Sequence, residues 1–212
     1  MVRWIDGSHP EVVGPETAVD PRREDLAKKL AMVLDALRQA RLPVEAVDDP
    51  HLRSYRGEPL VTMDKATRDN IERCRTLADF DLDLDAAEQI WAGAMKLPGA
   101  AHRTTPRWYH GDLAAENLLV RDGALAAILD FGGLSVGDPT VDLVVAWEVL
   151  DPPARELFRR RVGVDDETWL RGRAWALSIT LMIWYYWTTM PERRARCMAV
   201  GRNVLADAGY SV

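Results

Sequence analysis

Polar residues between positions 110 and 132 have the types that phosphoryl transfer requires. The segment His110-Gly-Asp-Leu-Ala-Ala-Glu-Asn117 is followed, after an apolar stretch, by Asp130-Phe-Gly132. Transfer of a phosphoryl group needs a carboxylate beside the attacking hydroxyl and oxygen ligands for Mg²⁺. Carboxylates and a side-chain amide are the groups that this segment provides.

The chain between Asn117 and Asp130 predicts a β-hairpin that brings these polar residues together. Two short apolar pieces, 117–120 and 125–129, flank the turn sequence Arg121-Asp-Gly-Ala124. The loop that carries Asp112 enters the hairpin at Asn117, and the second strand returns to the same end at Asp130. We therefore expect three polar side chains to converge on one metal-phosphate site. A turn whose Asp and Asn side chains bond only to the local backbone is the alternative, but it does not explain why all three occur together.

The neighbouring polar residues have simpler explanations. In the D-x-x-x-x-N loop of protein kinases the Asp is the base, so His110 is expected to pack the loop. Asp138-Pro139 is a helix N-cap followed by a first-turn proline, which makes Asp138 architectural. Asp142, in the first turn of the same helix, has either a structural or a functional role. Glu116 faces solvent or lies near a cationic substrate.

Together these motifs resemble the signature of the aminoglycoside phosphotransferase (APH) and small-molecule kinase superfamily. The matching segments are His110-Gly-Asp112, Asn117, Asp130-Phe-Gly132 and Gly137-Asp-Pro-Thr-Val-Asp142-Leu143. The resemblance implies an ATP-dependent phosphotransferase with Asp112 as the base and Asn117 and Asp130 as Mg²⁺ ligands. The residues with a structural role at the site are expected to be His110, Gly132, Asp138 and Asp142.

Two features distinguish the chain from a protein kinase. Gly111 stands where protein kinases have the Arg of H-R-D, and no A-P-E motif follows Asp130-Phe-Gly132. Gly137 comes so soon after Gly132 that little chain is left for an activation loop. The acceptor is therefore expected to be the hydroxyl of a small molecule.

The resemblance also implies a second lobe that this chain does not show. The opening Arg3-Trp-Ile-Asp-Gly7 resembles the hinge between the two lobes of the family, so we expect a hinge remnant and linker over 1–16 and a C-terminal lobe over 17–212. No G-x-G-x-x-G or G-K-[ST] motif is present to hold phosphates. Independent activity is therefore doubtful, and a truncated gene, a misplaced start and an isolated lobe all remain open. Apolar Val2, Trp4 and Ile5 would be uncovered, which favours self-association or docking of a separate N-lobe.

Acidic residues beyond the loop are candidates for binding an amino sugar. Glu148 and Asp151 lie at the end of one expected helix, and with Glu116 they could bind ammonium groups. A solvated acidic surface or a helix N-cap is the competing explanation for each of them.

The elements that must position these residues are mainly helical. After the cap signal Asp20-Pro21, apolar residues recur at helical spacing up to Pro43. Residues 44–63 have no clear period, short strands are expected at 2–5 and 107–109, and further helices at 64–79, 85–97, 139–150, 153–162, 166–189 and 191–208. The expected fold is a mainly α member of the α+β class, like the C-lobe of protein kinases, with a small hairpin at the site.

Composition limits the remaining possibilities. With 212 residues and 48% hydrophobic content, the chain can bury a full core. Its two cysteines lack disulfide or zinc spacing and no secretory signal opens it, so a cytoplasmic protein is expected. The apolar run Trp175–Trp187 is too short to span a membrane. The net charge of −6 disfavours nucleic-acid binding.

Two other functional classes remain possible. A non-catalytic kinase-like remnant could keep the fold and serve as a binding or regulatory module. A metal-dependent phosphoesterase could use Asp112, Asn117 and Asp130 to transfer phosphate to water.

Overall fold

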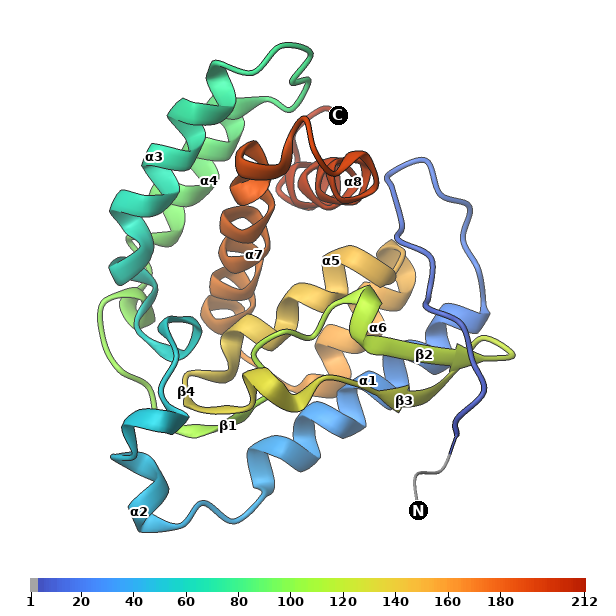
Figure 1. Cartoon of the computed structure of the whole chain (residues 1–212), viewed down its shortest axis with the longest axis vertical. Coiled ribbons are helices and arrows are strands. Elements are labelled where there is room, and N and C mark those ends of the chain that lie inside the picture. Colours follow the sequence, from blue (N-terminus) through green and yellow to red (C-terminus); the bar gives the residue numbers. More distant parts are fainter. Residues whose placement is uncertain (1–3) are drawn as a thin grey trace.

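The computed structural model describes residues 4–212 as a mainly helical assembly with two small antiparallel sheets (Figure 1). The α-helices are α1 (Arg22–Gln39), α2 (Val44–Val47), α3 (Asp64–Arg75), α4 (Leu84–Ala94), α5 (Val145–Val149), α6 (Pro152–Val162), α7 (Asp166–Leu181) and α8 (Pro191–Asp207). The strands are β1 (Arg107–Tyr109), β2 (Leu118–Arg121), β3 (Ala124–Ile128) and β4 (Ser135–Gly137). Short 3₁₀ turns connect them, notably at Tyr55–Gly57, Ala115–Asn117, Phe131–Gly133, Pro139–Val144 and Met182–Tyr186. The fold is the mainly α, α+β arrangement expected from the sequence.

The predicted hairpin is confirmed as β2 and β3. Leu118 pairs with Ile128 in an antiparallel register. Asp122 and Gly123 both have positive φ, of 54° and 78°, as a two-residue hairpin turn requires. The hairpin therefore returns the chain to the end at which it began.

Most predicted helices are confirmed to within a few residues. Asp20 Oδ1 accepts a hydrogen bond from the backbone N–H of Arg22 at the start of α1. The helix expected over 166–189 is α-helical only to Leu181 and then continues as a 3₁₀ turn. The helix expected over 139–150 opens as a 3₁₀ turn before α5. Strand β4 was not predicted, because Ser135-Val-Gly137 becomes a strand through its pairing with β1 rather than through a pattern of its own.

The core lies around α7, which is surrounded by α3, α4, α8 and the turn Pro139–Val144 (Figure 1). Trp91, Trp147 and Trp175 are completely buried there. Gly172 permits the close approach of α7 to that turn, since a Cβ atom would lie 2.8 Å from Cβ of Leu143. Among the described residues, no helix combines the length and apolar character that a membrane span needs. The core thus reaches β1 through the turn Pro139–Val144, which contacts both β1 and α7.

The segment before α1 crosses the hairpin. Ser8 pairs with Val120 through two backbone hydrogen bonds of 3.0 and 2.8 Å. The strand predicted at Val2–Ile5 lies partly outside the described residues, and Trp4 and Ile5 are not in a strand. Trp4 is 85% exposed and Ile5 43% exposed, as expected for apolar residues that nothing covers.

Candidate active site

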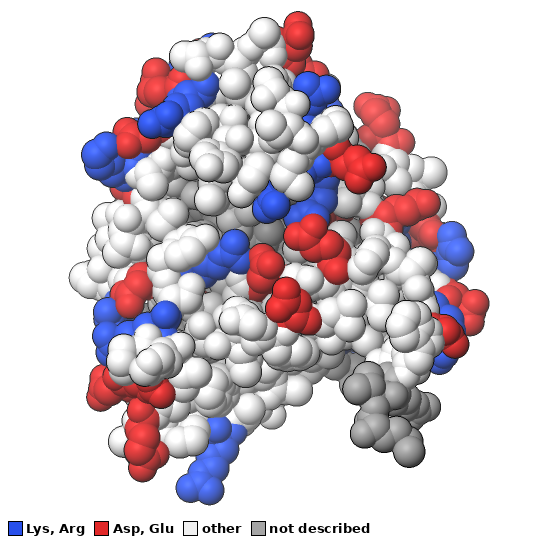
Figure 2. Space-filling model, in the orientation of Figure 1, with Lys and Arg blue, Asp and Glu red and all other residues white. Residues whose placement is uncertain are grey.

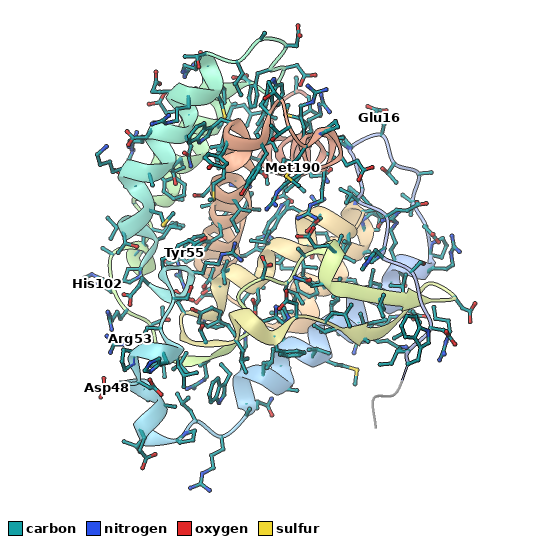
Figure 3. The ribbon with its side chains drawn as sticks, in the orientation of Figure 1. Glu16, Asp48, Arg53, Tyr55, His102 and Met190 are labelled. Carbon is teal, nitrogen blue, oxygen red and sulfur yellow. The ribbon has the colours of Figure 1, made fainter. Side chains whose placement is uncertain are left out.

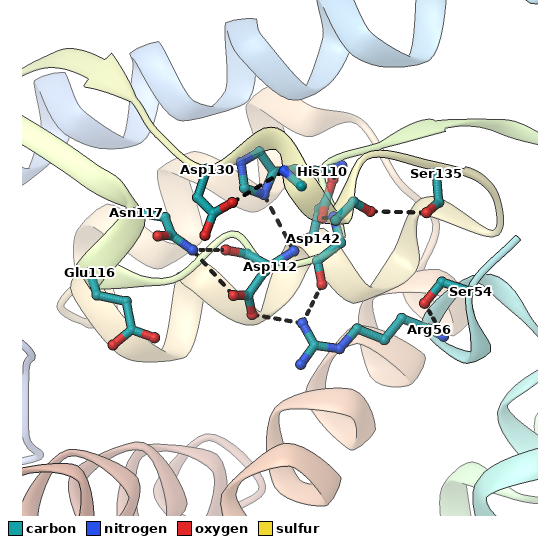
Figure 4. A network of polar contacts seen from close by, with 12 residues as sticks. Ser54, Arg56, His110, Asp112, Glu116, Asn117, Asp130, Ser135 and Asp142 are labelled. Atoms are coloured by element: carbon teal, nitrogen blue, oxygen red, sulfur yellow. Dashed lines mark hydrogen bonds and ion pairs between the residues drawn. The ribbon is translucent and has the colours of Figure 1, made fainter. Parts of the chain in front are cut away.

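Asp142 anchors the loop that carries Asp112. Its carboxylate accepts hydrogen bonds from the backbone N–H groups of His110, at 2.7 Å, and Gly111, at 2.9 Å (Figure 4). The side chain is buried, and this burial raises its pKa, whereas the two N–H bonds act in the opposite direction. Gly111 has φ 83°, a left-handed conformation that turns the chain toward Asp112. Asp142 thus fixes the backbone of the loop through two hydrogen bonds, as a residue with a structural role would.

His110 packs the loop, as expected. Its buried ring contacts the carbonyl oxygen of Leu129 through Nε2, at 2.9 Å, and Nδ1 accepts from the N–H of Asp112 at 3.3 Å. A neutral imidazole with its proton on Nε2 satisfies both contacts. The ring also meets Phe131 edge-on, with centroids 4.9 Å apart. His110 thus ties the loop to the end of the hairpin.

Asn117 joins Asp112 to the hairpin. Its Nδ2 donates to the backbone oxygen of Asp112 at 2.8 Å and to Oδ2 of the same residue at 3.2 Å. The carbonyl oxygen of Asn117 accepts from the N–H of Leu129 at 2.8 Å, which brings Asp130 to the same end of the hairpin. The predicted convergence of Asp112, Asn117 and Asp130 is therefore present (Figure 4).

Asp130 occupies a left-handed position with φ 54°, where its Oδ1 accepts from the N–H of Gly132 at 3.2 Å. With Asp112 it lines an open cavity of about 320 Å³. The amide nitrogen of Asn117 is engaged with Asp112, so the amide oxygen is the atom left for a ligand. A carboxylate and an amide oxygen suit Mg²⁺, which takes a few protein oxygens together with substrate phosphates. The residues present therefore fit the metal that the family resemblance implies.

Arg56 is a site residue that the sequence analysis did not identify. Its Nη1 donates to Oδ1 of Asp112 at 2.6 Å and also to the carbonyl oxygen of Gly111. The residue lies in a 3₁₀ turn of the irregular segment 44–63. No motif or periodicity marks it, because the contact joins parts of the chain that are far apart in sequence.

A second cavity, of about 60 Å³, opens on another side of Asp112 and contains Glu116 and Glu148. Arg196 bridges these two, with Nη1 2.7 Å from Oε2 of Glu116 and Nε 3.0 Å from Oε1 of Glu148. Glu148 is 3% exposed, and its burial raises its pKa, although Arg196 opposes the shift. Acidic and basic side chains gather around the hollow on this face (Figure 2).

Asp151, a predicted substrate-binding residue, is buried at the start of α6 and lies away from both cavities beside Asp112. Its side chain is 1% exposed and accepts from the N–H of Ala154, at 3.0 Å, as the N-cap of α6. It also accepts from the N–H of Asp20 at 3.0 Å and lines neither cavity beside Asp112. Asp138, by contrast, caps the turn Pro139–Val144 through the N–H of Thr140, as expected.

A helical lobe with a hairpin between a D-x-x-x-x-N loop and Asp-Phe-Gly defines the class of kinase-like phosphotransferases. Within that class, the chain belongs to the phosphotransferase enzyme family (APH), whose model matches residues 1–175. An aminoglycoside 3'-phosphotransferase of Escherichia coli is 28% identical over 162 residues, which are 71% of this chain and 56% of that protein. The chain thus spans little more than half the length of this curated relative.

Solved structures share the fold. ADP-bound aminoglycoside phosphotransferase APH(2'')-Ib superposes with a TM-score of 0.56 at 15% identity, covering 95% of this chain and 71% of that one. Macrolide 2'-phosphotransferase MphH from Brachybacterium faecium superposes with a TM-score of 0.55 at 21% identity, and the match covers 93% of this chain and 67% of that one. APH(2'')-IIa in its ternary complex with streptomycin and ATP superposes with a TM-score of 0.55 at 17% identity, and the match covers 86% of this chain and 62% of that one.

Proposed function

We propose that this chain is the catalytic lobe of an ATP-dependent phosphotransferase that moves the γ-phosphate to a hydroxyl of a small molecule, such as an amino sugar. The observation that carries the proposal is the position of Asp112 at the boundary of two cavities, beside Asn117 and Asp130. Relatives that are phosphotransferases, including one solved with ATP and streptomycin, support it.

In this proposal Asp112 is the base. Its side chain is 45% exposed, so an acceptor hydroxyl can approach it. The hydroxyl proton passes to Asp112 as the new O–P bond forms and the bond between the γ-phosphorus and its bridging oxygen breaks, leaving ADP. Asn117 and Asp130 would hold Mg²⁺, which supplies positive charge to the phosphates when bound. His110 and Asp142 keep the loop in place.

The acceptor would enter the cavity that contains Glu116 and Glu148. Their carboxylates lie beside Asp112, but Arg196 pairs with both of them. An ammonium group on the acceptor would have to replace Arg196 or share the carboxylates with it. We propose no role in binding for Asp151.

The 212 residues contain no glycine-rich phosphate loop, so we propose that full activity needs a nucleotide-holding lobe in addition to residues 17–212. The exposed hinge side around Trp4 and Ile5 is the surface that such a lobe, or a second copy, would cover. The exposure of Trp4 and Ile5 also favours the second candidate function, a non-catalytic binding module.

Incubation with γ-labelled ATP and a panel of aminoglycosides and macrolides tests the proposal. Label in an acceptor supports the phosphotransferase. Label released as inorganic phosphate at the same rate with and without acceptor would indicate a phosphoesterase. Failure of both the chain and a lobe-extended form to transfer label would favour the binding module.

A further inference from the structure

Arg56 stands in the wall between the two cavities at the site. It lines the cavity of about 320 Å³ that holds Asp130 and also the smaller one that holds Glu116 and Glu148. Its side chain is 22% exposed, and Nη1 is fixed by Asp112 and the carbonyl of Gly111. In the proposed reaction, the phosphoryl group crosses from the nucleotide side to the acceptor side at this wall.

Over residues 4–212, one nitrogen of the Arg56 guanidinium, Nη2, is free to donate hydrogen bonds to a ligand. Nε donates to the hydroxyl of Tyr55 at 3.0 Å, and Nη1 serves Asp112 and Gly111. Within the described part of the chain, Nη2 has no hydrogen-bond partner, and no other Lys or Arg lines the cavity shared with Asp130. A planar guanidinium with free N–H groups is well suited to phosphate oxygens.

The segment that carries Arg56 is packed firmly into place. A Cβ atom at Gly57 would lie 2.5 Å from the hydroxyl of Tyr109, and one at Gly137 would lie 2.6 Å from the carbonyl oxygen of Gly57. That oxygen accepts from the N–H of Asp138 at 3.0 Å. The ring centroid of Tyr55, a residue that is 46% exposed, lies 6.5 Å from that of Trp175 in α7. Arg56 is thus held where it is, unlike a long side chain free at the surface.

We propose that Arg56 contacts the terminal phosphoryl group of the nucleotide through Nη2 while Nη1 orients Asp112. The inference rests on the proposed function. When Asp112 takes up the hydroxyl proton it loses its charge, so the positive charge of Arg56 is then directed to the phosphoryl group. The chain would in this way supply from a distant segment the cation that its sequence motifs lack.

The test compares affinities for Mg-ATP and Mg-ADP, which differ by the terminal phosphoryl group. Titrations of the 212-residue chain to millimolar nucleotide, followed by NMR, should show that wild type prefers ATP. In Arg56→Gln we expect ATP affinity to fall about tenfold, the scale of one charge-assisted hydrogen bond, with little change for ADP. Arg56→Lys, which keeps the charge, should lie between the two.

Arg53→Gln is the matched control. Arg53 lies in the same segment, pairs with Asp48 at 3.2 Å and lines neither cavity; Figure 3 shows both at the edge of the molecule. This variant should bind both nucleotides as wild type does. Thermal melts check that each variant is folded. If Arg56→Gln does not fold, the test uses the ATP and ADP affinities of Arg56→Lys.

An equal loss for ATP and ADP, or no loss, overturns the inference. So does a wild-type chain that binds neither nucleotide or does not distinguish them. The proposed function fails separately: an ATP preference that depends on Arg56, without phosphorylation of any acceptor, contradicts that function and leaves the contact standing. Phosphorylation of an acceptor by a protein that shows no ATP preference supports the proposed function and contradicts the contact by Arg56.

Discussion

Asp112 is held by one side chain that is near it in sequence and by one from a distant segment. Asn117 donates to its Oδ2 at 3.2 Å and Arg56 to its Oδ1 at 2.6 Å. Asp130 is held separately, by the N–H of Gly132. At the scale of single residues, the proposed base and the proposed metal ligand therefore have different supports, and substitutions should separate their roles.

Asp130→Ala should remove metal binding, whereas Asp112→Asn should leave it largely intact. The reason is that Asp130 is proposed to supply a carboxylate oxygen for Mg²⁺, while Asp112 is proposed to act on the acceptor hydroxyl. Mn²⁺ can replace Mg²⁺ as a paramagnetic probe, with broadening of NMR signals near Asn117 as the measurement. Equal loss of broadening in both variants would refute this division of roles.

Glu148 should make stability depend on pH in a defined direction. Burial raises its folded-state pKa above the ordinary 4.5, so the folded protein holds the proton more tightly than the unfolded chain. The stability associated with the protonated form is then lost as pH rises from about 4.5 through the folded pKa. The free energy of unfolding of wild type, minus that of Glu148→Gln, should fall over this range by at most about 1.4 kcal/mol per pH unit. Urea unfolding measures this difference, and a value that stays constant or rises would contradict the assignment.

Residue types and spacing were enough to predict that Asp112, Asn117 and Asp130 lie together, because the loop and the hairpin between them are local in sequence. Arg56 could not be predicted in this way. It reaches Asp112 only after β1 and β4 pair and Gly57 packs on Tyr109. For Asp151 the sequence offered more than one explanation, and the structure shows the side chain as the N-cap of α6.

At the scale of elements, the site depends on close backbone contacts beside β4. Gly57→Ala should destabilise the protein by about 1–3 kcal/mol, because the new methyl group meets Tyr109. It should also weaken activity by moving Arg56. Gly93→Ala is the control: it lies in α4 with nothing within 4 Å of the added Cβ. It should stabilise the protein by about 0.4–1 kcal/mol. Chemical denaturation measures both, and equal effects would contradict the packing account.

Asp151→Ala tests the role of Asp151 as a cap. Loss of the N-cap of α6 and of the contact with Asp20 should cost about 0.5–2 kcal/mol in unfolding free energy. The KM for the acceptor, measured in an active form, should not change, because Asp151 lines neither cavity beside Asp112. A large rise in the KM for the acceptor with unchanged stability would indicate that Asp151 binds the acceptor.

Strong local signals made most elements predictable. The periodic helices and the Asp-Gly turn of the hairpin are examples. The short strand β4 and the 3₁₀ turns could not be predicted, since tertiary packing rather than a sequence period defines them.

At the scale of the whole molecule, the proposed ligands and base lie in this chain, but it spans 56% of its curated relative. Phosphoryl transfer depends mostly on positioning, and the chain has no glycine-rich loop to position phosphates. We therefore expect the 212 residues alone to bind Mg-ATP weakly and to transfer little phosphate. Addition of the N-terminal lobe of a related phosphotransferase should cover Trp4 and Ile5 and raise activity.

The most direct test is the amount of label that passes from γ-labelled ATP to an aminoglycoside or macrolide in this lobe-extended form. Wild type and Asp112→Asn are compared at equal concentration and with equal thermal stability. We predict label in the acceptor with wild type and a loss of about 10²- to 10⁴-fold in Asp112→Asn, the usual contribution of a general base. Equal transfer by both proteins would contradict the assignment of Asp112 as the base of a phosphotransferase.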